Sequence, residues 1–326
     1  MLSYLSGIKH PEAFHGAKKK QGFFEGWYLK IVSADQAQRW AIIPGIFFGN
    51  KDNPTKSTAF VQVLNGTTGQ TWFHEFEVNE FCASAKEFDV SIGKNHFDEK
   101  GIKINLPGLI GEIEFGSPLD TWPQTFSSPG IMGPYSFVPF MECNHGVVSF
   151  GHELSGELIV EDQKLDFLGG RGYIEKDWGS AFPKSYVWLH SNHFGNNADA
   201  SFIGSTAIIP WLGRSFNGVI VALKHGGNLY KWATYNRSKQ ISLTINDDSV
   251  NWILSGPEGL IEITATREKG GLLHAPVRKE MHKRVEETML AHFIIRHTDK
   301  NGKVLFEDFS DCSALEVHGE IETLLS

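Results

Sequence analysis

Cysteine is scarce in this chain of 326 residues, and long apolar runs and an excess of basic residues are missing. The three cysteines, Cys82, Cys143 and Cys312, are odd in number and far apart, and no two form a CxxC pair. This pattern argues against a zinc cage and against a disulfide framework. No window approaches 18 consecutive apolar residues, so no membrane-spanning helix is expected. The net charge of −8 argues against a nucleic-acid partner, which needs a basic face.

Cofactor and targeting motifs are absent as well. There is no Walker loop, no Gly-x-Gly-x-x-Gly between a strand and a helix, and no Gly-x-Ser-x-Gly elbow. We therefore expect no nucleotide, flavin or metal cofactor. The first ten residues lack a basic region followed by an apolar stretch, so no signal peptide is expected, and a reducing cytoplasmic location is the default. The short basic run at 18–20 is interpreted as solvated, with peripheral contact to an anionic membrane as the alternative.

What the chain has is glycine and aromatic residues, with 34 Gly, 24 Phe and 9 Trp. Glycine serves turns and bulges, and aromatic residues suit pleated faces, so this composition favours an all-β protein. Apolar and polar residues alternate along 102–106, 109–115, 241–245 and 289–295, whereas helical periodicity is scarce. The segment 117–139 holds five prolines and is expected to be a long ordered loop.

A weak internal repeat divides the chain into two similar halves. In each half a Trp-led, a Pro-containing and an aliphatic strand follow in the same order, at 27–29, 41–45 and 59–64 and again at 188–189, 207–211 and 218–223. Each half has about the size of a small up-and-down barrel, whose closed shape removes exposed strand edges. The prediction is an all-β fold of two lipocalin-like β-barrel domains in tandem, residues 1–170 and 171–326.

The densest group of polar side chains lies near the middle of the chain. On an extended strand Tyr173, Glu175 and Asp177 share one face, while Lys176 and Trp178 share the other. A carboxylate crowded by a second acid and by aromatic surface can donate a proton near neutral pH, so the first three residues form the candidate catalytic set. The alternative is a surface strand on which both acids pair with neighbouring cations.

Three other segments supply candidate ligand-binding residues. Glu25 and Trp27 lie among aromatic residues, and we interpret Glu25 mainly as a hydrogen-bonding brace of the barrel mouth and otherwise as a pocket carboxylate. Trp188 and Asn192 lie on one face of another strand, whose two histidines point to opposite faces, so no metal site is expected there. His145 lies at the polar end of an apolar segment that resembles a pocket wall.

Five segments of the chain stand out as ordered motifs: Phe24–Tyr28, Pro129–Gly133, Val138–Ser149, Gly172–Gly179 and Gly271–Pro276. Together they resemble the signature segments of the tocopherol cyclase-like family, and the likeness runs from about Phe23 to Gly319. The resemblance implies two lipocalin-type domains and a relation to the carotenoid 1,2-hydratases. Gly26-Trp27 also resembles the Gly-x-Trp that begins lipocalin barrels.

The resemblance also implies a reaction. Tocopherol cyclases protonate the trisubstituted alkene of a prenyl quinol, and the phenol oxygen then closes a chromanol ring; the hydratases protonate a similar alkene and add water. By position in the family motif Glu175 is the implied proton donor, with Tyr173 beside it, and Asn192 matches an Asn of the cyclases. Ile174 stands where the hydratases carry His, which weakens the hydratase interpretation.

Both reactions start with a tertiary carbocation, which the negative face of an aromatic ring stabilises. Trp27, Trp178 and Trp188 could supply such rings. The leading hypothesis is therefore a cofactor-independent cyclase that acts on a hydrophobic prenylated aromatic substrate. A non-catalytic carrier of an isoprenoid or another lipid is the main alternative, because a lipocalin-like fold does not fix a chemistry. A different enzyme on the same scaffold is the third.

Overall fold

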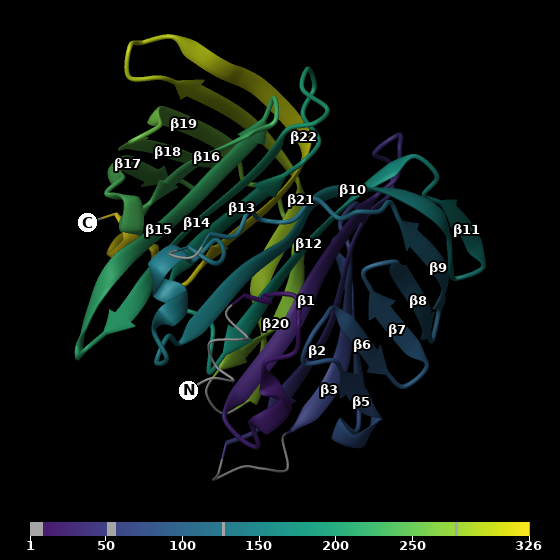
Figure 1. Ribbon diagram of the computed structural model, residues 1–326. Coiled ribbons are helices and arrows are strands. Elements are labelled where there is room, and N and C mark those ends of the chain that lie inside the picture. Colours follow the sequence, from purple (N-terminus) through teal and green to yellow (C-terminus); the bar gives the residue numbers. More distant parts are fainter. Residues whose placement is uncertain (1–8, 51–56, 126–127, 278–279, 326) are drawn as a thin grey trace. The chain divides into compact units, whose positions relative to one another are not determined.

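The computed structural model describes residues 9–50, 57–125, 128–277 and 280–325. Within them the chain forms two antiparallel sheets, and helix is limited to short 3₁₀ turns (Figure 1). The all-β prediction is confirmed. None of the helices in this part of the chain is long and apolar enough to cross a membrane. The turns are η1 (Gly16–Lys18), η3 (Val78–Glu80), η4 (Gly133–Phe137), η5 (Thr234–Asn236) and η6 (Ile321–Leu324).

The first sheet has 12 strands in the described part of the chain, in the order β4-β3-β2-β1-β12-β10-β9-β8-β7-β6-β5, with β11 paired to β10. The described residues of the proline-rich segment, 117–125 and 128–139, contain η4 and no strand, as predicted. The strands are β1 (Phe23–Val32), β2 (Arg39–Phe48), β3 (Thr58–Asn65), β4 (Gln70–Phe76), β5 (Phe81–Ala83), β6 (Asp89–Ile92), β7 (Asn95–Asp98), β8 (Gly101–Leu106), β9 (Leu109–Phe115), β10 (Cys143–Val160), β11 (Gln163–Asp166) and β12 (Gly170–Gly179).

The alternation of apolar and polar residues decides which face of this sheet is covered. In β8 the side chains of Ile102, Ile104 and Leu106 are buried, while Lys103 and Asn105 between them are exposed. Apolar residues from β1 to β3 and from β6 to β10 form one core, and β3 contacts β6. The two halves of the sheet therefore fold over the same apolar interior, on the face of β1 that carries Trp27.

The second sheet has 10 strands among the described residues, in the order β16-β15-β14-β13-β22-β21-β19-β18-β17, with β20 paired to β21. Its core again contains residues from both end strands, such as Trp232 of β16 and Leu243 of β17. The strands are β13 (Tyr186–Ser191), β14 (Ser201–Trp211), β15 (Arg214–His225), β16 (Asn228–Ala233), β17 (Lys239–Ile245), β18 (Ser249–Gly256), β19 (Gly259–Thr266), β20 (Gly271–Val277), β21 (Glu280–Thr298) and β22 (Val304–His318).

The repeat predicted from the sequence corresponds to matching positions in the two sheets. Strands β1, β2 and β3 occupy the same places in the first order as β13, β14 and β15 in the second. In each sheet the last long strand pairs with the first, β12 with β1 and β22 with β13. The two tryptophans of the repeat lie on different faces of their sheets. Trp27 belongs to the first core, whereas Val187 and Leu189 belong to the second core and Trp188 between them does not.

The sheets are not closed into barrels, and this part of the prediction is wrong. Strands β4 and β5 are the two ends of the first order, and β16 and β17 are the two ends of the second. In both cases the chain passes between the two edge strands through a 3₁₀ turn, η3 or η5. The turn residues satisfy local backbone N–H groups, as when Glu80 accepts from the N–H of Glu77 and Asn236 from that of Ala233.

The chain divides into two compact units. The first comprises residues 1–182 and 273–284, and the second comprises residues 183–272 and 285–326. Strand β12 lies in the first unit because it pairs with β1 and β10. The notion that each unit is a domain of its own stays a prediction.

Candidate functional site

Strand β12 lies between β1 and β10, and the register of these three strands places the polar residues singled out in the sequence. Glu175 faces Tyr28 on β1 and Val147 on β10. Asp177 faces Gly26 and His145 in the same way. Because directly opposite residues in an antiparallel pair project to the same face, His145 shares a face with both acids.

The side chains of Tyr173, Glu175, Asp177 and His145 are in contact, and we call them the acid–histidine cluster. The Tyr173 hydroxyl donates to Glu175 Oε2 at 2.7 Å. His145 Nδ1 and Asp177 Oδ1 are 2.9 Å apart, and His145 Nε2 lies 3.6 Å from Glu175 Oε2. Glu175 is 4% exposed and Tyr173 is fully buried. The predicted sharing of one face by the three β12 residues is thus realised, and His145 joins them from β10.

The charges in the acid–histidine cluster favour one arrangement of protons. Burial opposes protonation of His145, yet the carboxylates of Asp177 and Glu175 outweigh it and raise the pKa of His145 to about 9. Burial and the neighbouring Glu175 raise the pKa of the Tyr173 phenol well above its ordinary value. At neutral pH the cluster therefore holds an imidazolium and an un-ionised phenol, both directed at the Glu175 carboxyl group.

The same residues are the one His/Cys/Asp/Glu group in the described part of the chain that could hold a metal ion. One ligand atom from each of His145, Glu175 and Asp177 lies within 4.8 Å of the others. His145 Nδ1 and Asp177 Oδ1 are already at hydrogen-bonding distance from each other. The positive charge of His145 is therefore balanced by direct contacts with the two carboxylates, as in an acid–base group.

An apolar cluster lies beside the acid–histidine cluster on the same face of the first sheet. Phe24 faces Gly179, two residues beyond Asp177 on β12, and its ring meets that of Phe182 edge-on with centroids 5.3 Å apart. The apolar cluster comprises Phe24, Phe47 and Phe60, with Ile43, Phe73, Cys143, Phe182 and Met281 packed against them. Cys143 joins the two clusters, because its Sγ also lies 3.8 Å from Asp177 Oδ1.

The opposite face of β12 carries an ion pair between Lys176 and Glu25, both fully buried. Glu25 also accepts hydrogen bonds from the backbone N–H groups of His15 and Gly16, at 2.9–3.0 Å. His15 Nδ1 lies 3.0 Å from Glu25 Oε1 and 3.0 Å from Lys176 Nζ. Glu25 therefore braces the segment that precedes β1, whereas the brace expected from the sequence was that of a barrel mouth.

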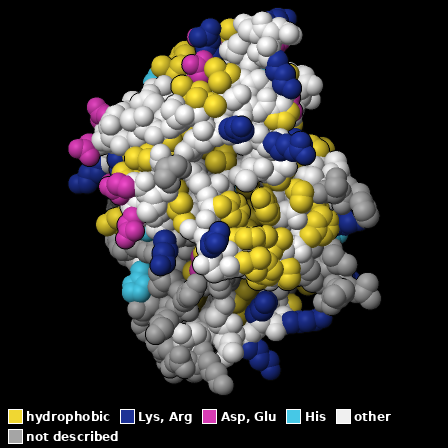
Figure 2. Space-filling model, turned by 90° about the vertical axis from the view of Figure 1, so that its left-hand side faces the viewer, with side chains coloured by type: hydrophobic (Ala, Val, Ile, Leu, Met, Phe, Trp, Pro, Cys, Tyr) yellow, Lys and Arg dark blue, Asp and Glu magenta, His cyan; other side chains and the backbone are white. Residues whose placement is uncertain are grey.

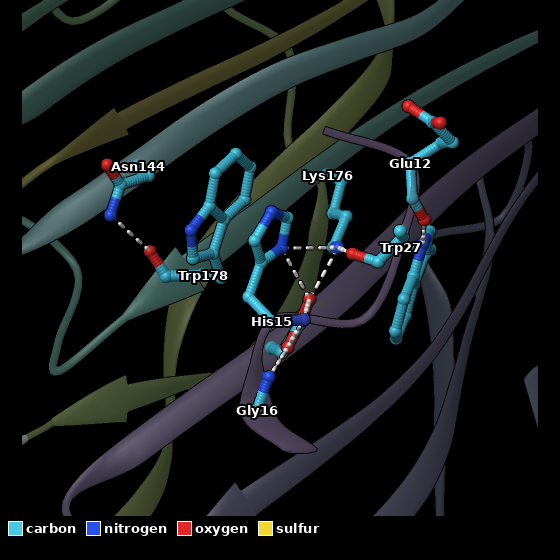
Figure 3. A network of polar contacts seen from close by, with 9 residues as sticks. Glu12, His15, Gly16, Trp27, Asn144, Lys176 and Trp178 are labelled. Atoms are coloured by element: carbon cyan, nitrogen blue, oxygen red, sulfur yellow. Dashed lines mark hydrogen bonds and ion pairs between the residues drawn. The ribbon is translucent and has the colours of Figure 1, made fainter. Parts of the chain in front are cut away.

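Aromatic rings enclose the Lys176 ammonium group. Its Nζ lies 4.5 Å from the ring centroid of Trp27 and 5.1 Å from that of Trp178, and the His15 ring stacks on Trp178. The Trp27 indole N–H donates to the backbone carbonyl of Glu12 at 2.9 Å (Figure 3). Burial lowers the pKa of Lys176, and Glu25 only partly offsets that effect. These contacts hold residues 12–16 against strands β1 and β12.

The predicted site residues thus fall into three groups. The candidate catalytic set lies together with His145. The candidate ligand-binding residues Glu25, Trp27 and Trp178 lie together on the other face of the same strand. Trp188 and Asn192 belong to the second unit, where the Trp188 ring stacks on His190 with centroids 6.2 Å apart. His15 was missed, because a lone histidine far from its partners in the sequence gives no local signal.

The fold and the acid–histidine cluster define a class, an all-β protein of two similar antiparallel sheets with a buried carboxyl group held by a phenol and an imidazole. The family model of tocopherol cyclase-like proteins matches residues 112–319, which is more than half of the chain. The chain therefore belongs to the tocopherol cyclase-like family, and the resemblance seen in the sequence is confirmed. The matched region contains all four residues of the acid–histidine cluster.

Individual proteins with a similar sequence or fold were also found. The chain is 24% identical over 196 residues to the rice (Oryza sativa subsp. japonica) protein named "Probable tocopherol cyclase, chloroplastic", which is 56% of this chain and 40% of the rice protein. The match thus spans less than half of that relative's length. Among solved structures, an AttH-type protein of Nitrosomonas europaea has a TM-score of 0.55 at 10% identity, covering 91% of this chain and 92% of its own.

Kievitone hydratase from Nectria haematococca is a second similar structure, with a TM-score of 0.51 at 11% identity. The likeness covers 95% of this chain and 94% of the hydratase chain. At such low identities these two structures show a shared fold and nothing about chemistry.

Proposed function

We propose that this protein is a tocopherol cyclase-like enzyme that protonates a prenyl alkene and closes a ring on a hydrophobic prenylated aromatic substrate. One observation carries the proposal. The buried carboxyl group of Glu175 accepts the Tyr173 hydroxyl and lies 3.6 Å from a His145 nitrogen that makes no hydrogen bond of its own. An alkene is a weak base, so its protonation needs an acid whose conjugate base is stabilised in advance.

The acid–histidine cluster has the parts that such a step needs. In this scheme the Glu175 carboxylate first takes the Nε2 proton of the His145 imidazolium, 3.6 Å away, and then transfers it to one alkene carbon, so that the other carbon becomes a tertiary cation. The Tyr173 hydroxyl, 2.7 Å away, stabilises the carboxylate left behind. The substrate's phenol oxygen then attacks the cation, and the phenol proton returns to the carboxylate. The proton taken and the proton released balance, so the net reaction is an isomerisation without a cofactor.

His145 is the proton relay of this scheme, and Asp177 orients it. The His145 Nε2 passes its proton to Glu175 before the reaction and takes a proton back from it afterwards, because only 3.6 Å separates the two atoms. Asp177, at 2.9 Å from Nδ1, fixes the orientation of the ring and stabilises its charge. Glu175 is thus the acid that meets the substrate, His145 is its proton relay, and Asp177 is a positioning residue.

The surroundings of the acid–histidine cluster suit an apolar substrate. The rings of Phe24 and Phe182 lie on the same face, and aromatic faces tolerate a carbocation without reacting with it. Beside Asp177, a Cβ added to Gly26 would meet nothing closer than 3.7 Å, so glycine leaves room there. The Trp27 and Trp178 rings lie on the other face of the sheet, so in this scheme Phe24 and Phe182 take their place.

We also propose that the two sheets form two lipocalin-like domains. Each sheet folds over one core and joins its last strand to its first, which supports two lipocalin-like domains. Lipocalin-like folds also serve as carriers, and the apolar cluster around Phe24 would serve a carrier of an isoprenoid or lipid equally well. The carrier function is therefore the second candidate, and turnover separates the two.

The test is conversion of prenyl quinols of several chain lengths, followed by chromatography of the chromanol product. Glu175→Gln keeps the shape of the side chain but removes the transferable proton, and it should lower the rate by about 10²–10⁴ while ligand affinity changes little. Asp177→Asn should be less harmful. Gly26→Ala, whose Cβ is accommodated beside Asp177, should weaken binding without altering the fold.

Three outcomes decide between the candidates. Full turnover by Glu175→Gln would show that another group donates the proton. Loss of turnover in Asp177→Asn alone would exchange the roles of the two acids. Tight binding of prenyl quinols by the wild-type protein, without any product, would establish the carrier instead of the cyclase.

A further inference from the structure

The hairpin of β14 and β15 extends beyond the strands on either side of it. Strand β13 pairs with β14 only as far as Ala207, and β16 pairs with β15 only as far as Ile220. Apart from one bond between the Ile208 N–H and the carbonyl of Ser185, the backbone of residues 208–217 pairs within the hairpin. In Figure 1 its tip projects at the left, away from the rest of the second sheet.

The tip of this hairpin is apolar where a water-exposed turn is normally polar. Leu212 is 79% exposed, the largest value among the exposed large hydrophobic residues of the described part of the chain. Trp211 and Phe216 meet edge-on beneath it with ring centroids 5.9 Å apart. Between residues 201 and 222 the sequence contains no Asp or Glu, and Arg214 is the cation nearest the turn.

Turn chemistry does not account for leucine at this position. Leu212 has a φ of 47° and Gly213 a φ of 81°, so both residues adopt the left-handed conformation of a tight two-residue hairpin turn. Glycine, asparagine and aspartate take up that conformation easily, whereas a leucine there costs free energy. Packing does not account for it either, because the side chain is exposed. A residue kept at such a cost points to a contact outside the chain.

The composition of the tip fits one kind of partner. Leucine and tryptophan side chains partition into the boundary between lipid headgroups and acyl chains, and an adjacent arginine binds lipid phosphates. Hydrophobic side chains and Lys and Arg side chains are both exposed in the view of Figure 2. We propose that the β14–β15 tip, residues 210–215, docks the protein on an anionic lipid bilayer, with Leu212 inserted among the lipids.

The test is sedimentation of the full chain with vesicles of phosphatidylcholine and phosphatidylglycerol in equal parts. Leu212→Asn removes the apolar side chain but suits the turn, so the fold should be kept while the partition coefficient falls roughly tenfold. Leu212→Phe should bind like the wild type. Leu168→Asn is the matched control, since Leu168 is 69% exposed elsewhere in the chain, and it should leave binding unchanged.

A second measurement locates the contact. Brominated lipids quench tryptophan fluorescence only within the bilayer, so the quenching lost on going from the wild type to Trp211→Phe reports the tip itself. Equal vesicle binding by wild type and Leu212→Asn would overturn the proposal. It would also be overturned by a wild-type protein that ignores vesicles but forms a dimer which Leu212→Asn dissociates. None of these readouts uses a prenyl substrate, so their outcome is independent of the proposed reaction.

Discussion

The buried ion pair of Lys176 and Glu25 gives the sharpest prediction about stability. Both side chains are fully buried, and Glu25 keeps its two backbone N–H donors if the lysine is removed. Lys176→Met therefore leaves a carboxylate in the interior without its cation. Breaking a buried pair in this way costs about 3–5 kcal/mol, a large share of the roughly 5–15 kcal/mol that stabilises a typical protein.

Removal of both charges should restore much of the loss. In the double variant Glu25→Gln, Lys176→Met no charge of the pair is left, and replacing a whole buried pair is often close to neutral. The amide introduced by Glu25→Gln would still face the N–H groups of His15 and Gly16, so we expect the double variant to be more stable than Lys176→Met. The assay is urea unfolding of the full chain, followed by circular dichroism and by tryptophan fluorescence.

A matched control uses the same substitution at the surface. Lys164 pairs with Glu157 in the exposed β10–β11 hairpin, and solvent screens that pair, so Lys164→Met should leave the unfolding midpoint in place. If Lys176→Met shifts the midpoint no further than Lys164→Met does, the reasoning is refuted. If the double variant is the least stable of all, the ion pair is a net source of stability and the neutral-replacement expectation is wrong.

The remaining predictions concern the neighbourhood of β12. The pKa of His145 is raised from 6.5 to about 9, so its stabilising contribution is complete below pH 6.5 and is lost as the pH rises through 9; wild type should lose on the order of 3 kcal/mol over this window, and His145→Gln should not. A flat wild-type profile across that range would contradict the assigned charge. In Gly172→Ala the new Cβ would lie 2.2 Å from Nε2 of His152, whose ring Ser149 holds at 2.9 Å, so thermal unfolding should show a loss of about 1–3 kcal/mol. The added change His152→Ala should relieve the clash, and a double variant no better than Gly172→Ala would locate the strain elsewhere.

Local periodicity was enough to predict the parts of the site that lie on one strand. The period of two in β12 placed Tyr173, Glu175 and Asp177 on one face and Lys176 and Trp178 on the other, as the structure has them. The order of strands in the repeat was likewise readable, because each strand carries its own apolar signature. Such features depend on residues close in sequence, where sterics and alternation decide the outcome.

Contacts between distant segments could not be predicted in the same way. His15 and Lys176 are in contact although they lie 161 positions apart in the sequence. The residues around either one give no indication of the other. The grouping of Trp27 with Glu175 as one site ignored a consequence of the same alternation, since Trp27 faces Lys176 and so lies on the opposite side of the sheet. Barrel closure was overestimated because a 3₁₀ turn of three residues, such as η3, leaves only a weak trace in the sequence.

The discontinuous make-up of the first unit has a consequence for how the chain is made. Residues 273–284 belong to this unit, although all of the intervening segment 183–272 belongs to the second. A ribosome therefore releases β1 to β12 long before it supplies the last piece of the unit they form. The early strands therefore wait in an incomplete state, in which Gln62 on β3 lacks the backbone of His274 that it hydrogen-bonds, while most of the second sheet is being synthesised. Folding in the cell is thus coupled across the two units, and a chain cut after β12 would lack part of its own first unit.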